Sequence, residues 1–276
     1  MAANTQKSTK RAAELSKEPP IFGDAQQGQL KRMYESPPRV AMRKDILRAL
    51  ALREGEWVLE LGTGPGLLAQ ALALAVGHTG KVVGVDINPG LVNMSRERCS
   101  DLPWTEFLQG DLTDLRVPDA EFDVVTASSV LQYVADIDTA LSEIHRVLRP
   151  QGRVLIFETE WDTMVWYSRD RARMKRVLAV WRNVFANPHI CQFIMPKLQE
   201  AGFQLLHREM IPTFSFELHD DPESMAGIDM IVDMVSGKDG ISRAEAEAWA
   251  EEQRQLGKQE KFMDCVCRLL CLAQKE

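Results

Sequence analysis

Short apolar runs alternate with segments of helical periodicity between residues 57 and 157. The apolar runs predict strands over residues 57–61, 81–86, 104–108, 122–127 and 153–157. Helical spacing of apolar residues predicts helices over residues 40–52, 67–76 and 136–148. Pro89 suits the first turn of a further helix. This regular alternation of strands and helices predicts a doubly wound parallel α/β sheet.

The pattern after residue 157 is less regular. Residues 161–188 are rich in aromatic side chains, and they include a basic segment with helical spacing at 169–180. The elements expected next are a helix over 190–201, a strand over 203–216, a helical insertion over 217–260 and a final strand over 262–272. Cys265, Cys267 and Cys271 share one face of that last strand, so we expect core residues without a metal.

Composition narrows the class of protein. The chain has 276 residues, 45% of them hydrophobic and 26% charged, as in globular proteins. Its net charge of −7 disfavours a general nucleic-acid-binding surface. No apolar run is long enough to cross a bilayer, and residues 1–20 are polar, predicted to be disordered and unlike a secretory signal. The five cysteines form no CxxC pair, which indicates reduced thiols in a cytoplasmic protein.

A glycine-rich turn carries the first chemical signal. The sequence ELGTGPG, which starts at Glu60, joins the first predicted strand to the following helix. Gly62 and Gly64 allow a sharp turn and a close approach of a ligand to the backbone. The free N–H groups of the helix start suit a carboxylate or a phosphate. The spacing is G-x-G-x-G rather than the G-x-G-x-x-G of dinucleotide sites, and Gly66 is expected to serve helix packing.

Two acidic residues support a ligand site at the same edge of the sheet. Asp86 ends the second predicted strand, and Asp111 follows the third. Each has a structural alternative, because Asp86 could cap the helix that begins at Pro89 and Asp111 could be a turn residue. Their order behind the glycine-rich turn makes a joint role in binding the better interpretation.

The motifs ELGTGPG, VVGVDINP, GDLTDL, FDVVTASSVLQYV and EIHRVLRPQGRVLI together resemble class I S-adenosylmethionine-dependent methyltransferases, most closely those of ubiquinone and menaquinone biosynthesis. The resemblance covers residues 57–157. It implies a Rossmann-like seven-stranded sheet with an antiparallel last strand, an N-terminal helical lid and a C-terminal helical insertion. It also implies one methyltransferase domain over 21–276, with a cofactor-binding core at 40–160 and substrate or lid segments at 21–39, 161–190 and 217–260.

The resemblance implies specific roles for residues that match its motifs. The implied cofactor-binding residues are Glu60, Gly62, Thr63, Gly64, Asp86, Ile87, Asp111, Leu112 and Ser128. In this scheme Glu60 lies near the amino group of S-adenosylmethionine. Asp86 accepts hydrogen bonds from both ribose hydroxyls, and Asp111 holds the adenine amino group.

The acceptor side is less defined. The methyl group of the cofactor is already activated, so no catalytic residue is required, and none is identified; no metal is expected. Candidate substrate residues are Tyr34, Gln132, Trp161, Trp166 and His189. Gln132 stands where quinone-type relatives often have a histidine, which weakens the case for a quinone.

A small or mid-sized organic molecule, methylated at oxygen, carbon or nitrogen, is the expected acceptor. A first alternative is a protein or RNA methyltransferase that docks through the basic segment at 169–176. A second is a non-catalytic cofactor-binding interaction protein. The oligomeric state is left open, with a homodimer as one option, and no nucleic-acid partner is expected.

Overall fold

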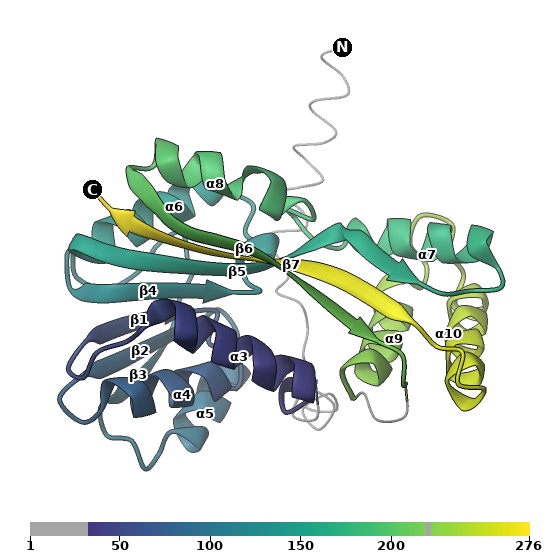
Figure 1. Ribbon diagram of the computed structural model, residues 1–276, viewed down its shortest axis with the longest axis horizontal. Coiled ribbons are helices and arrows are strands. Elements are labelled where there is room, and N and C mark those ends of the chain that lie inside the picture. Colours follow the sequence, from purple (N-terminus) through teal and green to yellow (C-terminus); the bar gives the residue numbers. More distant parts are fainter. Residues whose placement is uncertain (1–32, 219–221) are drawn as a thin grey trace.

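The computed structural model describes residues 33–218 and 222–276, and a single mixed sheet forms its centre (Figure 1). The strands are β1 (Trp57–Leu61), β2 (Lys81–Asp86), β3 (Thr105–Gln109), β4 (Phe122–Ser128), β5 (Leu148–Trp166), β6 (Phe203–Ser215) and β7 (Asp264–Lys275). Their order across the seven-stranded sheet is β3-β2-β1-β4-β5-β7-β6. Strands β1 to β5 are parallel, whereas β7 is antiparallel to β5 and β6. The predicted sheet with its antiparallel last strand is confirmed.

Helices cover both faces of this sheet. One face carries α3 (Pro37–Leu50), α4 (Leu67–Val76) and α5 (Pro89–Arg98), and the other carries α6 (Ile137–Val147) and α8 (Ile190–Glu200). In α6 the apolar residues recur at helical spacing and are buried, and the Asp136 side chain caps the helix start by accepting a hydrogen bond from Thr139 N at 3.0 Å. The strands between these layers are buried on both sides, which explains their nearly continuous apolar runs.

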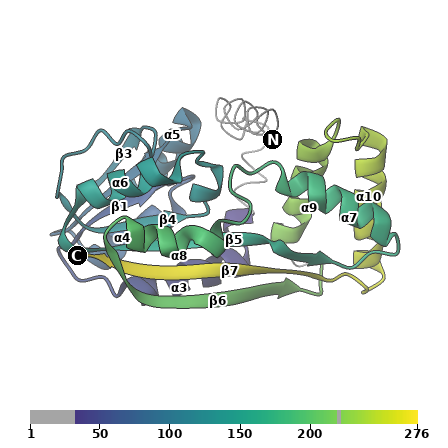
Figure 2. The ribbon, with the colours of Figure 1, turned by 90° about the horizontal axis from the view of Figure 1, so that it is seen from above.

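Strands β5, β6 and β7 continue past the core into a second, helical lobe (Figures 1 and 2). This lobe contains α7 (Arg171–Arg182), α9 (Pro222–Val235) and α10 (Arg243–Lys258), and the confirmed helical insertion supplies the last two of these helices. An apolar cluster around Trp166, Trp181 and Trp249 holds the lobe together.

Strand β5 is longer than the sequence predicted. A strand over 153–157 was expected, and residues 161–166 were assigned to a lid, but β5 runs for 19 residues to Trp166. The acidic residues Glu158, Glu160 and Asp162 interrupt the apolar pattern there, so periodicity alone could not follow the strand. Pairing with β7 continues beyond this interruption, after a register shift between Glu160 and Val165.

Two predictions for the chain ends have different outcomes. Cys271 is buried in the core, as expected, but Cys265 and Cys267 are only half-buried because they lie where β7 leaves the core helices. The disordered lead at 1–20 and most of the lid at 21–39 lie outside the described residues. The described part of that segment, from Met33, leads directly into α3.

Candidate functional site

The glycine-rich turn between β1 and α4 is shaped by backbone geometry that other residues resist. Gly62 has a φ of 69° and Gly64 a φ of 55°. A Cβ atom on Gly62 would lie 2.5 Å from Val130 Cγ2, whereas one on Gly64 would meet only Tyr34 Oη, at 3.6 Å. Tyr34 therefore lies over the open side of the turn. Gly66 serves helix packing, since a Cβ atom there would lie 2.8 Å from the Ser95 Cα atom of α5.

Glu60 holds the glycine-rich turn through a hydrogen bond with Thr63. Its side chain is only 3% exposed, and Thr63 Oγ1 donates a hydrogen bond to its Oε2 at 2.6 Å. Burial raises the pKa of Glu60 to about 8, and the Thr63 hydrogen bond only partly offsets that effect. The Glu60 carboxyl group is therefore mostly protonated at neutral pH, and a cation placed beside it would favour the ionised form.

Asp86 ties the turn to the end of β2. Its two carboxylate oxygens accept hydrogen bonds from Gly64 N and from Asn88 N, each at 2.9 Å. Burial raises the pKa of Asp86, although these backbone N–H groups oppose the shift. The side chain that caps α5 is Asn88, which accepts from Gly90 N and Leu91 N, so the alternative of Asp86 as that cap is wrong.

Glu60, Gly62 and Thr63 border a pocket at the carboxyl end of β1, whereas Gly64 and Asp86 do not line it. Its lining consists of Tyr34, Arg39, Met42, Arg43, Glu60, Gly62, Thr63, Pro65, Leu67, Leu68, Ser128 and Ser129. The pocket brings four of the predicted cofactor residues together with Tyr34, which was predicted for the acceptor. Arg39 and Arg43 were not predicted, because nothing in the amphipathic pattern of α3 distinguishes them from solvent-exposed arginines. Arg43 Nη1 donates to Tyr34 O at 2.7 Å and so fixes the tyrosine.

The residues predicted to hold adenine lie beside this pocket rather than in it. Ile87 and Asp111 line a separate open pocket with Gln109, Gly110, Asp114 and Arg116. Asp111 Oδ1 accepts hydrogen bonds from Thr113 N and Thr113 Oγ1, both at 2.8 Å, as the turn alternative predicts. Leu112 is buried in the core. Their contact with adenine stays a prediction.

The loop after β4 is held by a buried acid that the sequence analysis did not single out. Glu158 Oε1 accepts hydrogen bonds from Val130 N at 2.9 Å and Leu131 N at 2.7 Å. Burial raises the pKa of Glu158 to about 8. This acid positions the loop that begins with Ser128 and Ser129, whose hydroxyl groups are buried and have no hydrogen-bond partner among the described residues.

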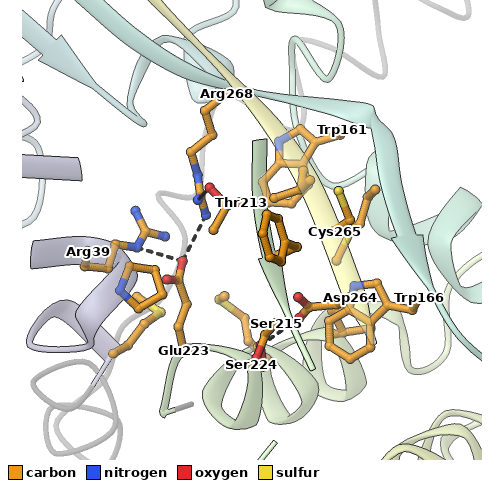
Figure 3. Close-up of a pocket in the computed structure, with 18 of the residues that line it drawn as sticks. Arg39, Trp161, Trp166, Thr213, Ser215, Glu223, Ser224, Asp264, Cys265 and Arg268 are labelled. Atoms are coloured by element: carbon orange, nitrogen blue, oxygen red, sulfur yellow. Dashed lines mark hydrogen bonds and ion pairs between the residues drawn. The ribbon is translucent and has the colours of Figure 1, made fainter. Parts of the chain in front are cut away.

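A second cavity, of about 100 Å³, lies between the core and the helical lobe (Figure 3). Strand residues Trp161, Trp166 and Val266 and helix residues Met230 and Ile231 make most of its surface apolar. Arg39 lines this cavity as well as the pocket beside the glycine-rich turn, so the two spaces meet at its side chain.

Three charged side chains from three elements converge at that junction. Glu223 of α9 lies between Arg39 of α3 and Arg268 of β7, with Nε and Nη2 of the arginines at 2.9 and 3.0 Å from its Oε1 (Figure 3). Burial raises the pKa of Glu223, but the two arginines outweigh it and hold that pKa below its ordinary value. The group links the N-terminal helix, the sheet and the lobe.

Gln132 and Trp161 form one unit. Trp161 Nε1 donates to Gln132 Oε1 at 2.7 Å, and the Trp161 ring stacks on Phe185 with centroids 4.5 Å apart. Gln132 is 3% exposed and lines neither of the two spaces described above. Of the predicted acceptor residues, Trp161 and Trp166 therefore border the cavity, while Gln132 orients one of them.

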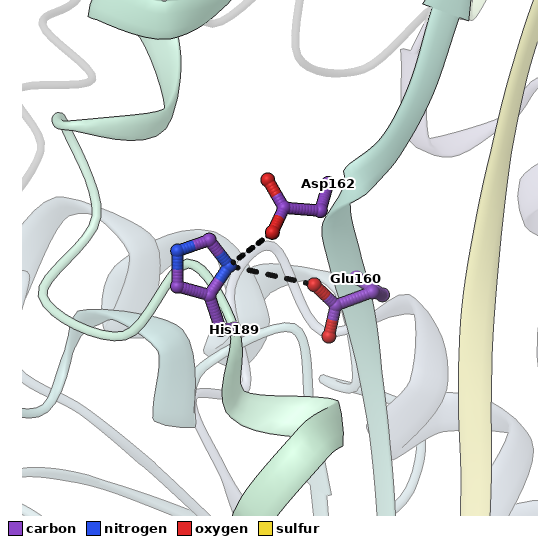
Figure 4. A group of neighbouring side chains, drawn as sticks. All are labelled: Glu160, Asp162 and His189. Atoms are coloured by element: carbon purple, nitrogen blue, oxygen red, sulfur yellow. Dashed lines mark ion pairs between the residues drawn. The ribbon is translucent and has the colours of Figure 1, made fainter.

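His189 lies elsewhere, in a group with two acids (Figure 4). Its Nδ1 is 3.0 Å from Asp162 Oδ2 and 3.5 Å from Glu160 Oε1. Three such ligand atoms could hold a metal ion. Here Arg182 also pairs with Asp162, and Gln192 donates to Glu160 Oε1 at 3.1 Å, whereas Glu160 Oε2 is buried without a hydrogen-bond partner among the described residues. We interpret the group as a structural contact that joins β5 to the start of α8.

The basic segment of α7 is partly paired with α10. Arg173 pairs with Glu252 of α10 at 2.6 Å, and Arg176 pairs with Glu245 of the same helix. Two arginines of the basic segment are therefore engaged by α10 and are not free to bind a large anionic partner.

Comparison with known proteins places the site in context. Residues 59–156 match a family model described as a methyltransferase domain. The chain is 33% identical over 127 residues to demethylmenaquinone methyltransferase of Oceanobacillus iheyensis, covering 45% of this chain and 53% of that protein. It is 42% identical over 119 residues to an uncharacterized 37.1 kDa protein of a Streptomyces fradiae transposon, covering 43% and 34% of the two chains. The chain thus spans a third to about half of these relatives.

Solved structures share the fold at low sequence identity. A proposed methyltransferase from Bacillus halodurans has a TM-score of 0.62 at 18% identity, over 85% of this chain and 99% of that one. A SAM-dependent methyltransferase from Aquifex aeolicus has a TM-score of 0.52 at 17% identity, over 90% and 99%. The domain match and the shared fold confirm the resemblance to menaquinone-type class I methyltransferases. No helix in the described ranges is long and apolar enough to cross a membrane.

Proposed function

We propose that this chain, whose residues 59–156 form a methyltransferase domain of the class I fold, transfers a methyl group from S-adenosylmethionine to a small organic acceptor. The observation that carries the proposal is the junction at Arg39. A pocket built from the glycine-rich turn meets a mainly apolar cavity at this one side chain. A cofactor in the first space would face an acceptor in the second.

The residues of the pocket, together with Asp86 beside it, suit the cofactor. Glu60, buried and ionisable, would pair with its ammonium group, and Asp86 would accept hydrogen bonds from its ribose. The guanidinium group of Arg43 would supply positive charge for its carboxylate. When bound, the cofactor supplies an activated methyl group, so the protein has to orient the acceptor and exclude water.

The acceptor would lie against the aromatic wall of Trp161 and Trp166. A small molecule suits this cavity because the cavity is small and mainly apolar, and two arginines of α7 are already paired with α10. Concave, mainly apolar sites with few polar groups are typical of small-molecule binding.

Calorimetry with S-adenosylhomocysteine, the demethylated cofactor, tests the proposal. We expect binding that survives a chelator and that a nicotinamide dinucleotide does not reproduce. Labelled cofactor incubated with fractionated small-molecule extract should then transfer its label to a product identified by mass spectrometry. Absence of binding, or tighter binding of the dinucleotide, would contradict the proposal.

A further inference from the structure

The charges of the acceptor cavity are unevenly placed. Arg39, Glu223 and Arg268 stand together at the end that adjoins the cofactor pocket, and their formal charges sum to about +1 at neutral pH (Figure 3). The other charged residue of the lining, Asp264, accepts a hydrogen bond from Ser224 Oγ at 2.7 Å. The cofactor end of the cavity is therefore electropositive.

The two arginines at this end have guanidinium N–H groups that no oxygen of the described residues accepts. Arg39 Nη1 donates to the Met42 sulfur at 3.8 Å, and the guanidinium lies over the Tyr34 ring, 5.8 Å from its centroid. No oxygen of the described residues accepts a hydrogen bond from either Nη group of Arg39. Arg268 is 7% exposed, and its Nε is buried without a hydrogen-bond partner in the described ranges. A buried guanidinium with unused donors is costly, so an anion placed here would be stabilised.

Both carboxyl groups of the described lining are already engaged by other side chains. Glu223 is held ionised between two arginines, which makes it a weak base. Asp264 already accepts a hydrogen bond from Ser224. No histidine lines the cavity. An acceptor that must lose a proton during transfer would need such a base, whereas an acceptor that is already ionised would not.

We propose that the acceptor is an apolar carboxylic acid and that its carboxylate oxygen is the methylated atom. This inference rests on the proposed function and names the substrate class of the same site. The flat apolar body lies on Trp161 and Trp166, and the carboxylate meets the free donors of Arg39 at the junction with the cofactor pocket. A carboxylate is ionised at neutral pH and matches the fork of a guanidinium.

The reaction balances without a base. A lone pair on the carboxylate oxygen forms the new bond to the methyl carbon, and the bond from that carbon to sulfur breaks with its electron pair left on sulfur. The negative carboxylate and the positive sulfonium become a neutral methyl ester and a neutral thioether. No proton moves, which agrees with a described lining whose carboxyl groups are both already engaged.

Matched probes test this without knowledge of the natural acceptor. With S-adenosylhomocysteine bound, titration calorimetry compares 2-naphthoic acid, its methyl ester and 2-naphthol on the unaltered chain. We expect the acid to bind about tenfold to a hundredfold more tightly than the ester or the naphthol, the effect of one charge-assisted contact. Arg39→Gln should remove this preference. Arg254→Gln, which alters an exposed ion pair between Arg254 of α10 and Asp229 of α9, should keep this preference.

The outcomes separate the two proposals. Binding of S-adenosylhomocysteine with no preference for the acid, or with a preference for 2-naphthol, overturns the carboxylic acid and leaves the methyltransferase proposal standing. A preference that Arg39→Gln leaves intact also overturns it. If S-adenosylhomocysteine itself does not bind, both proposals fail. Should Arg39→Gln not fold, the three probes on the unaltered chain decide the matter.

Discussion

Binding of S-adenosylhomocysteine should tighten as the pH rises from about 6 to 8, and Glu60→Gln should abolish that dependence. The free protein keeps Glu60 mostly protonated at pH 7, because burial raises its pKa to about 8. The ammonium group of the ligand, placed beside Glu60, favours the ionised carboxylate. Binding then requires loss of the proton, so affinity should rise by up to about tenfold per pH unit below 8 and level off above it.

Calorimetry at pH 7 in two buffers of different ionisation enthalpy measures the proton directly. A pKa of about 8 predicts that the unaltered chain releases about 0.9 proton more than Glu60→Gln does. Glu158→Gln is the matched control, since burial raises the pKa of Glu158 to about 8 as well, but its side chain holds the loop after β4 and does not line the pocket. An affinity that is flat between pH 6 and 8, or equally steep in Glu60→Gln, would refute the reasoning.

Four further predictions address the turn, the acids and the N-terminal segment. Asp86→Ala should weaken S-adenosylhomocysteine binding about tenfold to a hundredfold in calorimetry, because the ribose loses a charged acceptor, while circular dichroism shows that the fold persists. Gly62→Ala combines a φ of 69° with an approach of 2.5 Å to Val130, so thermal melts should show a loss of about 1–3 kcal/mol together with lost binding. The free energy of unfolding should fall as the pH rises between about 4.5 and 8, because the native protein holds protons on Glu60 and Glu158 that the unfolded chain has released. Chemical denaturation at several pH values should show that this fall is less steep in Glu158→Gln, by up to about 1.4 kcal/mol per pH unit. Deleting residues 1–36 removes Tyr34 from above the glycine-rich turn, and methyl-transfer assays should then show a strong loss while the remaining domain stays folded and binds cofactor more weakly.

The sheet could be predicted because its central strands β1, β2 and β4 are buried on both faces and its turns carry strong local signals. Apolar strand residues such as Val58 and Val124 are fully buried, as their pattern predicts. Gly62 adopts a positive φ, which is the backbone conformation that a glycine in a tight turn indicates. The same logic located Glu60 and Asp86, whose side chains hold that turn. The sequence did not predict residues whose role depends on partners that lie far away in the chain.

The arginine at the junction illustrates that failure. Arg39 lies on a helix whose pattern looks like any surface helix, and only the fold brings it to Glu223 and Arg268, far away in the sequence. The extension of β5 was missed for a similar reason. Glu158, Glu160 and Asp162 look like loop residues until their partners on the loop after β4 and on α8 are known.

The long strands also explain how the two halves of the site can act together. Strand β5 carries Glu158, which holds the loop bordering the cofactor pocket, and three residues later Trp161, which forms the wall of the acceptor cavity. Gln132, on that same loop, accepts the hydrogen bond from the Trp161 indole. A shift of the loop on cofactor binding would therefore be transmitted to the aromatic wall through one hydrogen bond and one strand. The loop and the wall have few independent ways to move, because both are fixed to β5, and cofactor occupancy should consequently shape the cavity that the acceptor enters.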